Sequence, residues 1–295
     1  MKKTFVSVFG ISLFFAISIN DSFANTIVNP TDTIRNTLLA SLDKSEETVV
    51  VQQANIVYPD ILAGNEDESI DYVENFSSRR KNYIINTYNR SKQLFPKAEA
   101  ILKKYDVPQE FKVLLALESG FNANAISKAG AVGYWQIMDE VAKEYGLKIP
   151  RKVRIEIKSK KRSKRVAKKH ITKTIGIDER KNFNKSTIVA ARYLKDRSRN
   201  LGNDWLLIAA SYNCGVGNVW NAMERSGKKS PTFWDIKKYL PAETRAYVMN
   251  FITLNVIFNN YEAFSKNELC FKNITCKTEA LEPDPINASD YFMEE

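Results

Sequence analysis

Residues 109–120 are Gln-Glu-Phe-Lys-Val-Leu-Leu-Ala-Leu-Glu-Ser-Gly, and the apolar side chains among them cover nearly the whole circumference of a helix. A helix that is apolar all round is buried inside a protein. Pro108 is suited to start this helix, and Gly120 is a natural stop. The stretch therefore predicts a helical core built around residues 109–119.

The segments on either side of this helix also have helical periodicity. They are residues 61–104, 139–145, 185–200, 205–212, 218–226 and 242–263. Residues 205–212 are again apolar all round, which predicts a second buried helix. Strand-like segments are few, so we expect a mainly α fold with one core.

The positive charge of the chain is concentrated in one segment. The formal net charge is +10, but residues 151–173 hold twelve Lys or Arg and a single acid, Glu156. The rest of the chain is close to neutral, which excludes a protein that coats polyanions with its whole surface. Residues 152–158 alternate in polarity like a strand, so the segment is either a small β-hairpin or an irregular loop.

The N-terminus has the layout of a cleaved export signal. Lys2 and Lys3 precede an apolar run over residues 4–19, and the sequence Ser22-Phe23-Ala24 offers small residues for cleavage. The alternative is an uncleaved anchor, although the run is short for a membrane span. In an exported compartment, Cys270 and Cys276 are close enough in sequence to form a disulfide, and Cys214 would be a buried thiol.

Glu118 is the outstanding candidate for catalysis. A carboxyl group at the end of an apolar helix loses hydration, which raises its pKa and favours the protonated form that a general acid needs. The structural alternative is a carboxylate that reaches solvent at the helix end. The single histidine, His170, lies in the basic segment, so we expect no His-dependent nucleophile, no metal site and no cofactor.

The residues after Glu118 are suited to an uncharged polar ring. No acid occurs between Glu118 and Asp139, and the intervening loop carries amide, hydroxyl and aromatic side chains. Such groups bind sugars by stacking and by hydrogen bonds. Glycosidases ordinarily use two carboxyl groups, so the loop favours a mechanism with one acid and help from the substrate.

Four motifs in order resemble those of one enzyme family. They are Ala116-Leu117-Glu118-Ser119-Gly120-Phe121-Asn122 with Ala125-Ile126-Ser127, then Gly133-Tyr134-Trp135-Gln136-Ile137-Met138, then Ala210-Ser211-Tyr212-Asn213-Cys214-Gly215, and finally Leu240-Pro241-Ala242-Glu243-Thr244-Arg245-Ala246-Tyr247-Val248. This series resembles the lytic transglycosylases with a soluble-transglycosylase, goose-lysozyme-like domain. The resemblance covers residues 56–260.

The resemblance implies a lysozyme-like fold and cleavage of peptidoglycan between N-acetylmuramic acid and N-acetylglucosamine. It makes Glu118 the group that protonates the glycosidic oxygen and then accepts the proton of the muramic 6-hydroxyl, leaving a 1,6-anhydro end. It also implies that seven residues line or support the groove for the glycan strand: Ser127, Gln136, Met138, Tyr212, Asn213, Glu243 and Tyr247. A hydrolytic muramidase and a non-catalytic wall-binding scaffold remain alternatives.

The basic segment is the largest departure from the family pattern, because it is inserted where the family has a short connection. It is either an attachment site for an anionic component of the cell envelope or a solvated loop, and export argues against nucleic acid as its partner. The expected organisation is a signal peptide over 1–24, a linker over 25–55, a helical leader over 56–105, a lysozyme-like domain over 106–262 with the insertion at 150–176, and an acidic tail over 263–295. We expect the protein in the periplasm or cell envelope.

Overall fold

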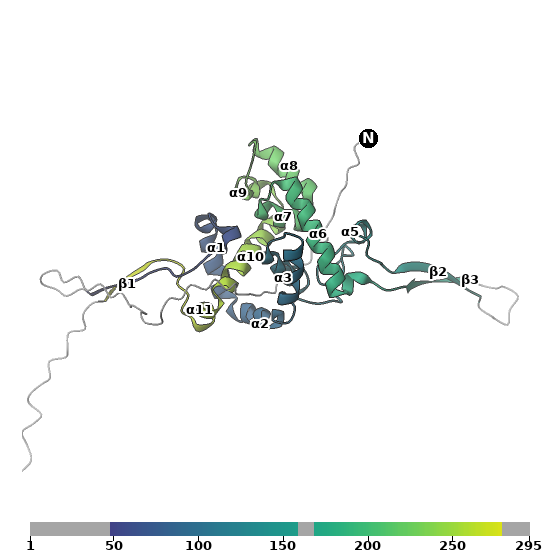
Figure 1. Cartoon of the computed structure of the whole chain (residues 1–295), viewed down its shortest axis with the longest axis horizontal. Coiled ribbons are helices and arrows are strands. Elements are labelled where there is room, and N and C mark those ends of the chain that lie inside the picture. The colour runs from purple at the N-terminus through teal and green to yellow at the C-terminus, as the bar shows by residue number, and fades with distance from the viewer. Residues whose placement is uncertain (1–47, 159–167, 279–295) are drawn as a thin grey trace, which may run out of the picture.

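The computed structural model describes residues 48–158 and 168–278 of the chain (Figure 1). The predicted signal peptide and most of the predicted linker lie outside the described residues, as do the tip of the basic insertion and the end of the acidic tail. Among the described residues, no helix is both long enough and apolar enough to cross a bilayer.

The described chain is mainly helical, as predicted. Its α-helices are α1 (Glu66–Arg79), α2 (Lys81–Ser91), α3 (Phe95–Lys104), α4 (Leu114–Ser119), α5 (Asp139–Glu144), α6 (Phe183–Leu201), α7 (Trp205–Cys214), α8 (Val216–Ser226), α9 (Phe233–Ile236), α10 (Ala242–Asn259) and α11 (Tyr261–Lys266). Short 3-10 helices are η1 (Asp60–Leu62), η2 (Gln109–Val113), η3 (Glu179–Lys181) and η4 (Lys237–Tyr239). The strands are β1 (Thr48–Gln52), β2 (Arg151–Lys158), β3 (Lys168–Ile175) and β4 (Ile274–Thr278).

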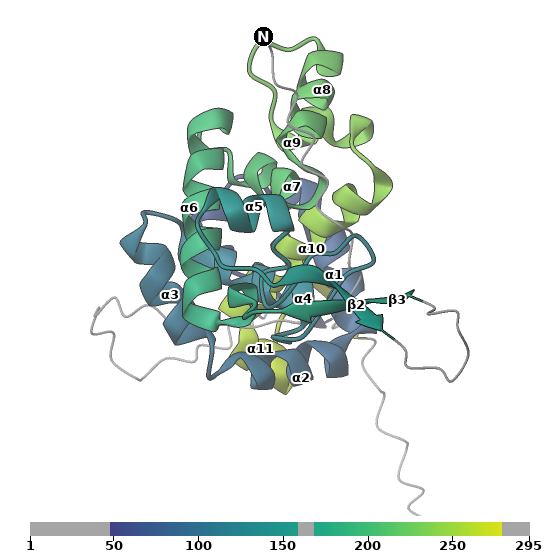
Figure 2. The same cartoon turned by 90° about the vertical axis from the view of Figure 1, so that its right-hand side faces the viewer.

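Three helices form the centre of the core. In α4, every side chain from Leu114 to Glu118 is buried, and α7 is buried from Leu206 to Tyr212. Helix α10 is buried continuously from Val248 to Phe258, and it contacts α1, α4 and α7. Figure 2 shows α4 in the middle of the helical body. The two segments predicted to be apolar all round are therefore buried helices.

The helix predicted over residues 109–119 differs in one respect. Its first part, η2, is a 3-10 helix, in which the Phe111 N–H bonds to the Pro108 carbonyl at 3.2 Å. Regular α-helix begins only at Leu114. Helix α9 was not predicted, because four residues are too few to show helical periodicity.

Two small antiparallel sheets lie on opposite sides of the body (Figure 1). Strands β2 and β3 form the hairpin that was one of two alternatives for the basic insertion, with Arg151 paired to Ile175. Strand β1 pairs with β4, joining residues that we expected in a linker to residues that we expected in a tail. The run Thr-Val-Val-Val-Gln has strand propensity, but its partner is more than 200 residues away and invisible to local periodicity.

Two cysteines are described with their side chains. Cys270 is buried and its thiol is free, whereas the side chain of Cys276 lies outside the described part. Cys214, predicted to be a buried thiol, is only half-buried. Burial of part of the side chain still raises the pKa of its thiol, which favours the protonated form.

Candidate active site

Glu118 occupies the last turn of α4 and is almost fully buried, with 5% of its surface exposed. Its Oε1 atom accepts a hydrogen bond of 2.6 Å from the hydroxyl of Tyr247, which lies on α10. The two residues are 129 positions apart in sequence. The contact between α4 and α10 therefore creates the immediate surroundings of the carboxyl group.

Burial raises the pKa of Glu118 to about 8, against a smaller lowering by the hydrogen bond from Tyr247. Removal of water disfavours the carboxylate form more than a single hydrogen bond favours it. The side chain is therefore mostly protonated at neutral pH. This is the state required of a general acid, and the alternative of a solvent-exposed carboxylate at the helix end is wrong.

No second carboxyl group of the described residues contributes to this pKa shift, whose causes are burial and Tyr247. Glu243, on the same face of α10 as Tyr247, has its own pKa raised by burial alone. The described residues also hold no group of three or more side chains that could bind a metal ion. The pKa of Glu118 is thus set by its burial and by one neighbouring hydroxyl group.

The loop after Glu118 is held against the end of α4. Gly120 ends the helix in the left-handed conformation with φ of 57°, which glycine adopts without a steric penalty. The Ser119 hydroxyl donates to the Tyr134 carbonyl at 2.8 Å, and the Arg90 guanidinium bonds to the Gly120 carbonyl. These contacts fix the path of residues 120–138 relative to the catalytic candidate.

Gln136 is the most constrained residue of this loop. It is fully buried and has a φ of 46°, a value that side-chain-bearing residues rarely adopt. Its Nε2 donates to the carbonyls of Gly133 at 2.8 Å and Ala125 at 3.3 Å, whereas its Oε1 accepts no hydrogen bond from the described residues. Backbone strain and an unpaired buried oxygen together are typical of a functional site.

Tyr212 connects the loop to α7. Its hydroxyl donates to the Trp135 carbonyl at 2.8 Å, and the Trp135 indole N–H in turn donates to the Thr187 hydroxyl at 2.9 Å. Tyr212 is 1% exposed, and this burial raises the pKa of its hydroxyl. The nearby charge of Glu118 raises the pKa of Tyr212 further. Tyr212 and Tyr247 thus lie beside the carboxyl group, and Tyr212 also supports the loop.

The other predicted site residues differ in their surroundings. Asn213 is half-buried and its Oδ1 accepts from the Thr244 hydroxyl at 2.8 Å. Met138 and Glu243 are half-buried. The Ser127 hydroxyl accepts the Ala131 N–H at 3.0 Å, so this residue closes a turn in the loop. Among the described residues, the hydrogen bond of the Glu118 side chain is to Tyr247 and that of the Ser127 hydroxyl is within its own turn.

Arg180 is a supporting residue that the sequence analysis missed. It is 4% exposed, forms ion pairs with Asp178 and Asp139, and donates to the Ile137 carbonyl at 3.3 Å. A Cβ atom added at Gly133 would lie 2.3 Å from the Arg180 carbonyl oxygen, so only glycine fits there. The sequence feature that could have indicated this role is the run of Asp178, Glu179 and Arg180 directly after the basic insertion.

Comparison with known families gives a match to the transglycosylase SLT domain over residues 95–234. This part of the chain, slightly under half of its length, is therefore similar to the transglycosylase SLT domain. The matched residues contain Glu118, the loop that follows it, and Tyr212 and Asn213. Tyr247 and Glu243 lie just beyond the matched range, on the helix that contacts Glu118.

Two named proteins are similar in sequence. The membrane-bound lytic murein transglycosylase D of Escherichia coli K12 is 29% identical over 188 residues, which are 63% of this chain and 36% of the relative. A putative tributyltin chloride resistance protein of Alteromonas sp. (strain M-1) is 24% identical over 137 residues, or 46% of this chain and 55% of the relative. The chain thus spans about a third of the length of the first relative.

Two solved structures are similar at low identity. The inactive mutant of the lytic transglycosylase Slt from Pseudomonas aeruginosa has a TM-score of 0.43 at 17% identity, covering 71% of this chain and 30% of that one. The complex of the 70-kDa soluble lytic transglycosylase with bulgecin A has a TM-score of 0.40 at 16% identity, covering 76% and 40% of the two chains.

Proposed function

We propose that this protein is a peptidoglycan lytic transglycosylase that cleaves the bond between N-acetylmuramic acid and N-acetylglucosamine without water. The observation that carries the proposal is the lone buried Glu118, protonated near neutral pH and bonded to Tyr247. The match of residues 95–234 to the transglycosylase SLT domain supports it, as does the similarity to a lytic murein transglycosylase.

In the proposed mechanism, Glu118 donates its proton to the glycosidic oxygen as the bond to C1 of the muramic residue breaks. The carboxylate left behind keeps the hydrogen bond from Tyr247, which lowers the cost of the buried charge. It then accepts the proton of the muramic 6-hydroxyl, whose oxygen forms the new bond to C1. The carboxylic acid is regenerated, and the glycan ends in a 1,6-anhydro ring.

We assign the other predicted residues to two roles. The half-buried Met138, Asn213 and Glu243 are positioned to contact the glycan strand. The buried Gln136 and Tyr212, with the turn at Ser127, hold the loop that borders the site.

Analysis of the products tests the reaction. Digestion of purified sacculi should give soluble fragments whose muramic ends are 18 mass units lighter than the hydrated sugar, because no water is added. Mass spectrometry before and after borohydride reduction distinguishes the two outcomes, since the anhydro end has no reducing group. Fragments with free reducing ends would identify a hydrolytic muramidase instead.

We also propose that the protein works in the cell envelope, where the β2–β3 hairpin contacts an anionic lipid surface. Residues paired directly across an antiparallel sheet point to the same side, and alternate residues of one strand do as well. The pairs Arg151 with Ile175 and Val153 with Lys173 therefore share one face, together with Ile155.

The composition of this hairpin face favours a lipid surface. Its apolar side chains are exposed, with Val153 at 40%, Ile155 at 37% and Ile175 at 50%. The cations Arg151 and Lys173 lie beside them and are exposed too. Anionic headgroups attract each such cation by about 1 kcal/mol, and branched apolar side chains gain by entering the interface.

Vesicle binding tests the hairpin face. The protein should sediment with phosphatidylglycerol vesicles and not with phosphatidylcholine vesicles. Replacing Val153, Ile155 and Ile175 together with Ser should reduce binding by about tenfold, since each lost apolar side chain costs about 1 kcal/mol or less at an interface. The matched control is Arg154→Ser on the opposite face, and equal losses in both variants would contradict the assignment.

A further inference from the structure

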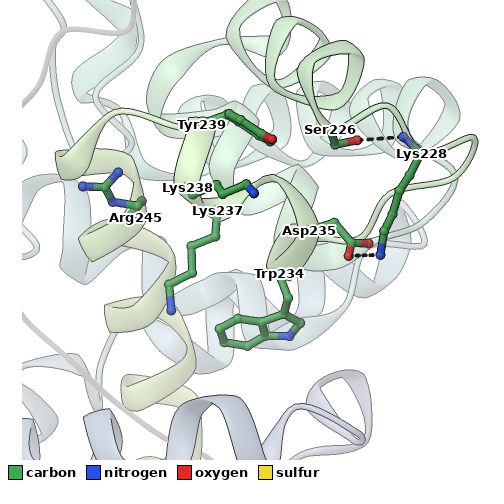
Figure 3. Close-up of a pocket in the computed structure, with 8 residues that line it drawn as sticks. All are labelled: Ser226, Lys228, Trp234, Asp235, Lys237, Lys238, Tyr239 and Arg245. Atoms are coloured by element: carbon green, nitrogen blue, oxygen red, sulfur yellow. Dashed lines mark hydrogen bonds and ion pairs between the residues drawn. The ribbon is translucent and has the colours of Figure 1, made fainter.

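A surface pocket of about 650 Å³ lies between the end of α8, helices α9 and η4, and the first turns of α10 (Figure 3). Its wall carries four cationic side chains, Lys228, Lys237, Lys238 and Arg245, and one acid, Asp235. Two aromatic side chains, Trp234 and Tyr239, also line the pocket, and Lys237 and Lys238 lie over their rings. The pocket therefore has a net positive charge in a chain that is close to neutral outside its basic insertion.

The single acid of the pocket, Asp235, is already paired with a cation of the pocket. Asp235 forms an ion pair with Lys228, and its Oδ2 accepts the Thr232 N–H at 2.9 Å in the capping of α9. Both contacts lower the pKa of Asp235, which stays ionised and paired. Among the described residues, no carboxylate lies within ion-pair distance of the three remaining cations, Lys237, Lys238 and Arg245.

Lys237 has partners that do not neutralise its charge. Its ammonium group lies over the Trp234 ring at 4.6 Å from the centroid, and its other contact is the Met249 sulfur at 3.4 Å, a weak acceptor. Burial and the nearby charge of Arg245 lower the pKa of Lys237, with Glu68 opposing them. Two cations thus repel each other in a half-buried position, where a bound anion would relieve both.

The Trp234 ring is held in place before any ligand arrives. The Trp234 indole N–H donates to Asn65 Oδ1 at 2.7 Å, which fixes the ring against the start of α1. The Tyr239 ring is covered by Lys238 at 5.0 Å and by Arg225 at 4.9 Å. Cations that rest on fixed rings lose little conformational freedom when they bind an anion.

The pocket is separate from the candidate active site. Arg245 and Met249 each lie two residues beyond Glu243 and Tyr247, a rotation of about 200° around α10. Tyr247 contacts Glu118 on one side of the helix, whereas Met249 contacts Lys237 on the other. A ligand in the pocket would therefore leave Glu118 accessible to the glycan strand.

We infer that this pocket binds an oxyanion, a carboxylate or a phosphate group, between Lys237 and Arg245. The Arg245 Nη1 donates one hydrogen bond to the Leu240 carbonyl at 3.2 Å, and the other N–H groups of the guanidinium remain to bind the oxygens of either group. Lys237 supplies a point charge. Trp234 and Tyr239 provide flat apolar walls for whatever carries the anion. In an enzyme of the cell wall, the carrier would be an acidic peptide attached to the glycan or a phosphorylated envelope component.

Titration with two small probes tests the inference. Inorganic phosphate and glutarate are added to the full chain at low salt, and binding is followed by the indole N–H resonances in NMR. The Trp234 signal, assigned with Trp234→Phe, should shift and saturate at millimolar concentration. Saturation by phosphate alone or by glutarate alone supports the site and identifies the class of its natural carrier.

Variants distinguish specific binding in the pocket from general attraction of anions to positive charge. Lys237→Gln and Arg245→Gln should each weaken binding at least tenfold, whereas Lys237→Arg should retain it. The control is Lys229→Gln, which removes the same charge from an exposed neighbour outside the lining. Equal weakening by the control, or a wild-type signal that never saturates, would overturn the inference. The NMR signal does not depend on glycan cleavage, so this test of the pocket is independent of the proposed reaction.

Discussion

Replacing Glu118 with Gln should abolish the release of soluble glycan from purified sacculi. Glutamine keeps the size and polarity of the side chain and can still accept the hydrogen bond from Tyr247, but it has no proton of suitable acidity. General acid catalysis contributes roughly 10²–10⁴-fold to a rate, and the same group also acts as the base in the proposed reaction. We expect the initial rate to fall by about 10³-fold or more.

The control for this experiment is Glu140→Gln, because Glu140 is an exposed carboxylate on α5, at the far end of the same loop. It should keep the wild-type rate, and both variants should bind sacculi as the wild type does. If Glu118→Gln released glycan at the wild-type rate, the acid would be idle and Glu118 would have no catalytic role. If neither the wild type nor the variant released glycan although both bound sacculi, a wall-binding scaffold would be the better description.

The catalytic candidate could be predicted from sequence because its signal is local. The four apolar side chains directly before Glu118, from Leu114 to Leu117, are visible in the sequence, and the structure buries all of them. The hydrogen bond from Tyr247 could not be predicted in this way, since it depends on how α4 packs against α10. The motif resemblance placed Tyr247 near the groove without indicating which atom it contacts.

The difference between local features and contacts of distant segments also explains which parts of the fold could be predicted. Helices α5 and α7 begin at the expected residues, Asp139 and Trp205, because apolar periodicity is a local feature. The pairing of β1 with β4 and the support given by Arg180 to residues 133–139 join distant segments. The pocket is lined by residues of one short stretch, 226–245, but its shape depends on the turn between η4 and α10, which helical periodicity does not indicate.

The burial that makes Glu118 a suitable acid should also make the folded protein less stable as the pH rises. The pKa of Glu118 is about 8 in the folded state and about 4.3 in an unfolded chain. Between these values, the folded state holds a proton that the unfolded state has released. The free energy of unfolding therefore falls with increasing pH across this window, and the loss is complete above pH 8.

Glu118→Gln removes this dependence, because an amide does not titrate. The variant and the wild type should have similar stability near pH 4.5, and at pH 7.5 the variant should be more stable by about 3 kcal/mol. Urea unfolding of both proteins at the two pH values measures the difference, in which the other titrating groups cancel. Glu140→Gln should follow the wild type at both. A constant difference between Glu118→Gln and the wild type would mean that the carboxyl group titrates normally, and the acid role proposed for it would lose its physical basis. A gain that appears only as the pH rises would instead show that the folded protein gives up stability to keep this one carboxyl group protonated.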